Sequence, residues 1–289
     1  MGTSSAFGGQ LGGSLIPSWL GGEDGTPVAN PDLNQTSSDD NASQEVPSAP
    51  SGRTIPQEIE RNQFTSARTN FTGFASSGGA DRAKLGRAVS RYIASSTGGA
   101  KQAALRMGTS RSAGANLARF LSEVRTEGIQ HALNTLNLSE YAGRPIEEVF
   151  LGLADFICPV NGTIDEGIAR SAFIETIIDM GDAGITDLNL LSADQMQTVM
   201  ELYITHTIEA RLCNDIGTKI TIKPDNIAAF EVAHDQLHDF LRGGVSDALT
   251  HARADMESLT FEHAMQFIDS VYEQAFGLLQ TLGEKEANR

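Results

Sequence analysis

Two histidines one helical turn apart are the clearest candidates for metal chemistry in this chain. They occur in His234-Asp235-Gln236-Leu237-His238, where a spacing of four residues places both imidazoles on one face of a helix. Zinc hydrolases with this spacing carry a glutamate directly after the first histidine, whereas this chain has the shorter Asp235 there. No third ligand follows at a matching spacing. We therefore expect a solvated helix face and no metal site.

A second polar run, Glu209 to Lys219, stands where another helix is expected to end. Arg211 and Asp215 are four residues apart, so the simplest interpretation is an ion pair on one helix face, with Gly217 ending the helix. The alternative is a corner that binds a partner or a small molecule.

Nucleophilic catalysis has no local signature in the chain. The Gly-x-Ser-x-Gly turn of serine hydrolases is absent. His206, His251 and His263 stand singly in helical patterns, which is typical of surface or packing residues. Cys158 and Cys213 lie in apolar helical patterns and are expected to be buried thiols in a reducing compartment. We expect no catalytic residue and no cofactor.

Basic side chains concentrate between residues 53 and 125, which hold twelve Lys or Arg against four acids, although the whole chain has a net charge of −16. A row of them could follow a nucleic-acid backbone. The alternative is a helical surface that pairs with residues 126–289, which hold nine Lys or Arg against twenty-seven acids. The candidate contacts are Arg68, Arg82, Lys84, Arg87 and Arg91.

Two similar glycine-rich joints, around Gly78-Gly79 and Gly98-Gly99, each precede an expected helix. Backbone N–H groups at such a helix start can hold a phosphate. Neither joint continues with the Gly-Lys-Ser/Thr ending of a P-loop, so simple helix punctuation is the favoured interpretation.

These features need a scaffold, and the apolar spacing predicts an all-α protein, a helical bundle-like domain with a disordered N-terminal tail. We divide the chain into a tail (1–52), a basic glycine-rich helical segment (53–128) and an acidic helical domain (129–289). Capping boxes at Thr163/Glu166 and Ser192/Gln195 predict two helix starts. Only residues 219–223 alternate like a strand.

Helix faces can also be assigned from the spacing of apolar residues. Ile177 and Ile178 are expected to face the core after the first capping box, and Met265 in a last helix from about Thr260 to Leu282. A helix from about Asp225 could break at Gly243-Gly244.

The tail is rich in Gly, Ser, Asp, Asn and Pro, and such a composition cannot bury enough apolar surface to offset the entropy of ordering. One apolar island, residues 15–20, holds the only Trp of the chain. It is expected to be a docking motif for a partner, or alternatively to fold back on its own domain. No secretory signal and no membrane-spanning run is visible, so a cytoplasmic location is expected.

Four blocks of sequence resemble the QatB family of the bacterial Qat anti-phage defence system. They are Met1–Gly9, Leu15–Leu20, the run from Ala67 to Gly79 and Ile208–Gly217. The resemblance covers most of the chain, with residues 22–52 the least informative. It implies a setting with a QatA ATPase, a QatC protein similar to 7-cyano-7-deazaguanine synthases and a QatD protein similar to TatD nucleases.

The resemblance further implies a non-enzymatic component that is the partner or protein substrate of QatC, whose relatives can join a deazaguanine to a protein N-terminus. In that setting Gly2 would be modified after loss of Met1, and Thr3 and Ser4 would bind in the enzyme cleft. The residues expected to anchor the tail to the partner are Leu15, Ile16, Pro17, Trp19 and Leu20. The alternative function is nucleic-acid binding by residues 53–125.

Overall fold

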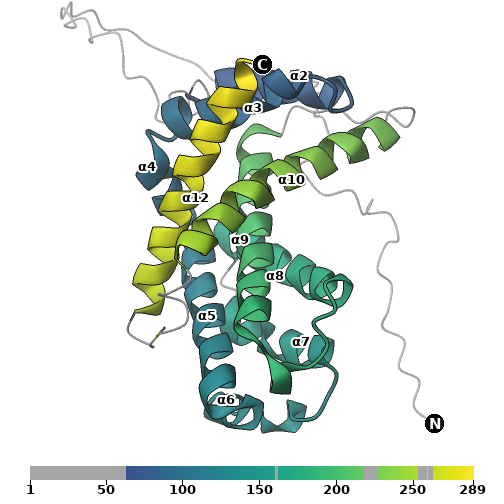
Figure 1. The fold of residues 1–289 in the computed structure, drawn as a ribbon, viewed down its shortest axis with the longest axis vertical. Coiled ribbons are helices and arrows are strands. Elements are labelled where there is room, and N and C mark those ends of the chain that lie inside the picture. The colour runs from purple at the N-terminus through teal and green to yellow at the C-terminus, as the bar shows by residue number, and fades with distance from the viewer. Residues whose placement is uncertain (1–62, 160–161, 218–226, 253–258, 260–262) are drawn as a thin grey trace, which may run out of the picture. The chain divides into compact units, whose positions relative to one another are not determined.

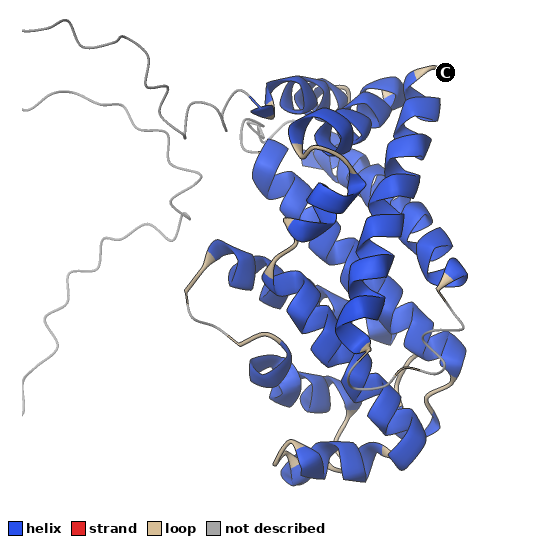
Figure 2. Cartoon of the chain, turned by 90° about the vertical axis from the view of Figure 1, so that its left-hand side faces the viewer, coloured by secondary structure: helices blue, strands red, loops and turns tan. Residues whose placement is uncertain are grey.

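The structure is a computed structural model that describes residues 63–159, 162–217, 227–252, 259 and 263–289 (Figures 1 and 2). The expected tail and the strand-like residues 219–223 lie outside these ranges. Every regular element within them is helical, which confirms the all-α prediction for this part of the chain. No helix in it is both long and apolar enough to cross a membrane.

Ten α-helices follow one another in the described part, with a π-helical turn η1 (Tyr92–Ser96) and two short 3-10 turns, η2 (Ser139–Tyr141) and η3 (Leu188–Leu190). The α-helices are α2 (Thr65–Ser76), α3 (Arg82–Arg91), α4 (Ala100–Leu105), α5 (Thr109–Glu127), α6 (Ile129–Thr135), α7 (Ile146–Ile157), α8 (Ile164–Asp182), α9 (Ala193–Ile216), α10 (Ile227–His251) and α12 (Ala264–Ala287).

Both expected capping boxes are present. Thr163 Oγ1 accepts the Glu166 amide at 3.2 Å, and the Thr163 amide donates to the Glu166 carboxylate at 3.0 Å. Ser192 and Gln195 repeat the exchange at 3.1 and 3.0 Å. These reciprocal bonds satisfy amides that the first helical turn leaves without partners, so the sequence fixes where α8 and α9 begin.

The glycine joints punctuate the helices, as favoured from the sequence. Gly78 (φ 61°) and Gly79 (φ 82°) follow the end of α2, and Gly99 (φ 103°) is the N-cap of α4. At the start of α3 the Asp81 carboxylate accepts the Lys84 amide. A carboxylate therefore already occupies the helix start that follows the first joint.

One hydrophobic core runs through the described helices. Leu85 and Leu117, from the basic segment, belong to the same core as Phe173, Tyr203 and Tyr272 from the acidic part. Figure 1 shows α12 lying along α3, so the C-terminal helix completes the packing of one of the first described helices. Residues on both sides of position 128 thus fold around shared apolar contacts.

Three sequence expectations about helices are wrong. Ile178 is 59% exposed and Met265 36% exposed, because the buried faces of their helices include the adjacent positions Ile177 and Ala264 instead. Gly243-Gly244 does not break α10, which is continuous from Ile227 to His251. A Cβ on Gly244 would meet Leu279 of α12 at 2.7 Å, so the missing side chain allows these two helices to pack closely.

Candidate functional site

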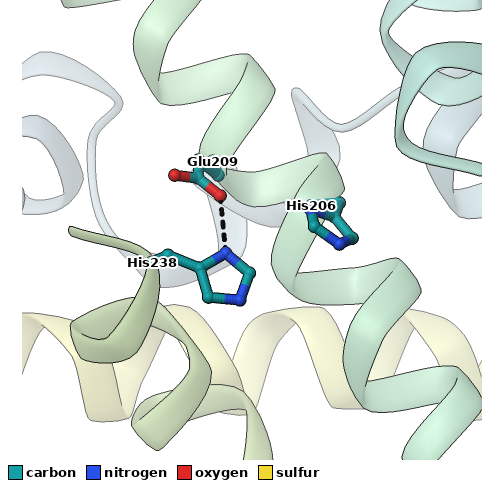
Figure 3. Close-up of side chains that lie close together, drawn as sticks. All are labelled: His206, Glu209 and His238. Carbon is teal, nitrogen blue, oxygen red and sulfur yellow. Dashed lines mark hydrogen bonds and ion pairs between the residues drawn. The ribbon is translucent and has the colours of Figure 1, made fainter. Parts of the chain in front are cut away.

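A cluster of histidines and acids lies between α9 and α10 (Figure 3). His206 and Glu209 are three residues apart on α9 and therefore share a face. His238 reaches them from α10, and its Nδ1 donates to Glu209 Oε2 at 2.8 Å. The rings of His206 and His238 have centroids 5.1 Å apart. One ligand atom from each of the three side chains lies within 4.8 Å of the others.

Glu209 is the buried member of the cluster. Its side chain is only 7% exposed, and its second oxygen, Oε1, accepts no hydrogen bond. His234 Nε2 lies 3.1 Å from that oxygen, close enough for an ion pair but without hydrogen-bonding geometry. A buried carboxylate oxygen without a hydrogen bond is costly, so this position calls for a positive neighbour.

A further shell of charge surrounds the three residues. His206 Nε2 donates to Asp179 of α8 at 2.8 Å, and Arg242 of α10 pairs with Glu201 of α9 at 2.6 Å. The hydrogen bond to Glu209 is the main cause of a raised pKa of His238. Partial burial and Arg242 oppose this shift, whereas Asp179 supports it.

Two imidazoles and a carboxylate from facing helices can hold a divalent metal ion. Alternatively, an imidazole and the carboxylate can exchange a proton. Sequence spacing joins His234 and His238 as a pair but does not join them to Glu209 or His206, which come from another helix. The spacing His206-x-x-Glu209 was a visible signal, since it puts two donors on one helix face. The expectation of no metal rested on the missing glutamate after His234 and on a missing third ligand, and the structure supplies two candidates for that third ligand.

Comparison with known proteins supplies the family. The family model described as Qat anti-phage system associated protein QatB matches residues 98–279. The chain belongs to the QatB family. No curated protein and no solved structure matches the chain.

Membership in the QatB family gives this chain a role in the Qat anti-phage defence system and implies association with other Qat components. The matched region includes His206, Glu209 and His238, whereas the expected tail lies before it. The geometry described above therefore belongs to the part of the chain that the family shares.

The expected Arg211–Asp215 pair of this QatB-family chain is wrong. Arg211 instead pairs with Asp165 of α8 at 2.6 Å. Asp215 accepts a hydrogen bond from the buried Tyr92 hydroxyl at 2.8 Å. It also forms an ion pair with Arg106 at 3.4 Å. A neighbour one turn away contributes only about 0.2–0.5 kcal/mol, so contacts with other helices prevailed. Gly217 does end α9, its amide donating to the Cys213 carbonyl at 2.8 Å.

The five basic side chains expected to contact nucleic acid all have partners inside the protein. Three of these partners belong to the acidic part of the chain, which favours the pairing alternative, while nucleic-acid contact stays a prediction. The contacts are Arg68 to the Asp215 carbonyl, Arg82 to Glu286, Lys84 to Asp81, Arg87 to Asn70 and the Ala287 carbonyl, and Arg91 to Ser66.

Both cysteines are free thiols, Cys158 buried and Cys213 half-buried. Burial raises the pKa of each to about 12, so neither forms a thiolate readily near neutral pH. The predicted modification and docking residues, which are Gly2, Thr3, Ser4, Leu15, Ile16, Pro17, Trp19 and Leu20, lie outside the described residues.

Proposed function

We propose that this QatB-family chain is a non-catalytic Qat component that binds a QatC-like deazaguanine-synthase homologue and presents Gly2 to it for modification. The observation that carries the proposal is the family match, which assigns the chain to the Qat anti-phage system. The resemblance to this family implies that the system includes such an enzyme. The sequence of the tail supports it, since a glycine follows Met1 and an apolar island with the only Trp follows thirteen residues later.

The chemistry requires a nucleophilic amine and an activated acid. Removal of Met1 next to a small residue leaves the α-amine of Gly2, which is partly neutral at cellular pH and has no side chain to hinder attack. A deazaguanine-synthase-type enzyme uses ATP to activate a carboxylate. The amine attacks that carbon, the activating group leaves, the nitrogen loses a proton and an amide results.

The folded part supports a role without catalysis of its own. Its two thiols have pKa values of about 12, so they are poor nucleophiles near neutral pH. Tyr203 and Tyr272 are fully buried in the core, where burial is the main cause that raises the pKa of each hydroxyl. In this proposal the helical domain recognises partners and the tail is the substrate.

Mass spectrometry of the intact chain, produced with and without the neighbouring Qat genes, tests the proposal. Co-expression should add the mass of a deazaguanine group to a chain that lacks Met1. Gly2→Leu should retain Met1, remain unmodified and lose phage protection, whereas Gly9→Leu in the same tail should behave like the wild type.

Partner recognition is tested separately with Trp19→Ala. This variant should bind the QatC-like partner more weakly while its helical domain melts as the wild type does. An unmodified Gly2 amine after co-expression, together with protection by Gly2→Leu, would show that the proposed modification is wrong.

A further inference from the structure

We infer that His206, Glu209 and His238 form a binding site for one divalent transition-metal ion of the zinc type, a site that ties α9 to α10. The site is independent of the proposed modification of Gly2, because it lies in the helical domain and uses none of the tail residues.

The donor set selects the class of ion. Two imidazole nitrogens and one carboxylate oxygen suit Zn²⁺ and its neighbours in the transition series, whereas Ca²⁺ and Mg²⁺ prefer sites built from oxygen alone. Two histidines with one carboxylate also suit Fe²⁺, so the experiment must compare these ions.

The geometry requires only side-chain adjustment. Ligand atoms about 2.0–2.2 Å from a tetrahedral ion lie roughly 3.4 Å from one another. Here the three ligand atoms already lie within 4.8 Å, with His238 Nδ1 and Glu209 Oε2 at 2.8 Å. Ligand atoms that lie as far apart as 4.8 Å must come closer, and the distance from His238 Nδ1 to Glu209 Oε2 must open by about half an ångström. Rotations about the side-chain bonds can produce both changes.

The buried carboxylate is the second reason. Glu209 is more than nine-tenths buried, and its Oε1 accepts no hydrogen bond. An imidazole carries a positive charge only when it is protonated, so the neutral form of a histidine leaves the charge of Glu209 uncompensated. A divalent cation compensates it at every pH at which the imidazoles are free to bind.

The surrounding groups complete the pattern of a metal site. Asp179 accepts from one nitrogen of His206 at 2.8 Å, which orients the ring and leaves its other nitrogen for an ion. Together Glu209 and Asp179 carry two negative charges, which balance a divalent ion. Arg242 is held by Glu201 at 2.6 Å and so does not take the place of that ion.

In this proposal His234 becomes the fourth ligand after a movement of its side chain, since it lies outside the group of three ligand atoms that are already close together. It lies one turn before His238 on α10, and its Nε2 is 3.1 Å from Glu209 Oε1. Its side chain is 50% exposed, so it can move onto an ion without breaking core contacts. Four protein ligands describe a structural rather than a catalytic zinc site, because no position is left for a water molecule.

Metal titration of the full-length chain tests the site. Chelator-treated protein should take up one equivalent of Zn²⁺ and melt at a higher temperature with it. His206→Gln and His238→Gln should each lose this uptake. His251→Gln changes the same residue type at the exposed end of α10, about 20 Å along the helix from His238, and should bind as the wild type does. Asp179→Asn, which removes one of the two negative charges and loosens the orientation of His206, should bind about 10–100-fold more weakly.

Cobalt(II) keeps the test decisive even where a variant fails to fold. The wild-type chain should give the intense visible absorption of four-coordinate Co²⁺, and Zn²⁺ should displace the Co²⁺, while Mg²⁺ and Ca²⁺ should not. Tighter binding of Fe²⁺ than of Zn²⁺ would overturn the assignment to zinc. The absence of Zn²⁺ uptake, the weak spectrum of six-coordinate aqueous Co²⁺, or equal uptake by folded His238→Gln and His251→Gln would overturn the site itself.

Discussion

Glu209 organises the polar side chains between α9 and α10 at the scale of single residues. A carboxylate this deeply buried is tolerated when other groups compensate its charge, and the two nearest are imidazoles. Their charge depends on pH, whereas that of an arginine would not. The stability of the metal-free protein should therefore respond to pH near neutrality.

We predict that chelator-treated protein loses stability as pH rises above 6.5. The pKa of His238 in the folded chain is raised above its ordinary value of 6.5, chiefly by its hydrogen bond to Glu209. A raised pKa stabilises the fold fully below 6.5, and that contribution is lost as pH rises through the folded value. Asp179 supports this charge and Arg242 opposes it.

Melting temperatures measured across pH 5.5–8.5 check this prediction, with pH limits chosen about one to two units on either side of the ordinary histidine pKa. His238→Gln should show a smaller decline over the same range, and His251→Gln should follow the wild type. Identical slopes in His238→Gln and the wild type would place the pH dependence in other groups.

The sequence could predict residues that share a helix, but not those that meet across helices. The spacing of His234 and His238 correctly placed them near one another on α10. Glu209 lies twenty-nine positions before His238, and only the packing of α9 on α10 brings the two together. Arg211 failed for the same reason, since Asp165 of α8 is its partner.

The helices illustrate the same limit at the next scale. Capping boxes and apolar periodicity located α8 and α9 because both signals depend on contacts within four residues. Apolar periodicity predicts burial well at the centre of a helix face and poorly at its edges, because a shift of one position rotates a side chain by about 100°. Ile177 and Ile178 are such neighbours, and only Ile177 is buried.

These neighbours provide a matched test. Ile177→Ala should destabilise the protein by about 2–5 kcal/mol, because it removes a buried side chain and leaves a cavity. Ile178→Ala should change stability by no more than about 0.5 kcal/mol, since that side chain is 59% exposed. Urea unfolding of both variants measures the difference. Equal losses would mean that another surface covers Ile178 in solution.

The packing of α12 against α3 joins the two ends of the described part at the scale of the whole molecule (Figure 1). Gly86 and Gly283 allow it: a Cβ on Gly86 would lie 2.5 Å from the Gly283 carbonyl oxygen, and a Cβ on Gly283 would lie 2.7 Å from that of Gly86. The sequence does not show that these glycines meet, because their close approach depends on the complete fold.

Gly86→Ala should therefore lower stability by about 1–3 kcal/mol, since backbone must move to admit the methyl group. Gly243→Ala is the matched control, because it also lies inside a helix but has nothing within 4 Å of the added Cβ. That variant should gain up to about 1 kcal/mol from better helix propensity. Thermal melting compares them, and a stabilised Gly86→Ala would show that α3 and α12 separate easily.

Removal of residues 1–52 tests the division between tail and domain. The described core begins at Phe64 and includes apolar side chains from α2 to α12. Deletion of 1–52 therefore removes none of these contacts, and we expect the melting temperature to change by less than about 5 °C, roughly 1–2 kcal/mol for a domain of this size. The shortened chain should also escape modification by the QatC-like partner, because Gly2 and the island at residues 15–20 are gone.

A larger loss of stability would instead support the alternative interpretation of that island, namely that it packs on its own domain. Trp19→Ala in the full-length chain distinguishes the two cases, because it should lower the melting temperature only if the island contributes to the fold.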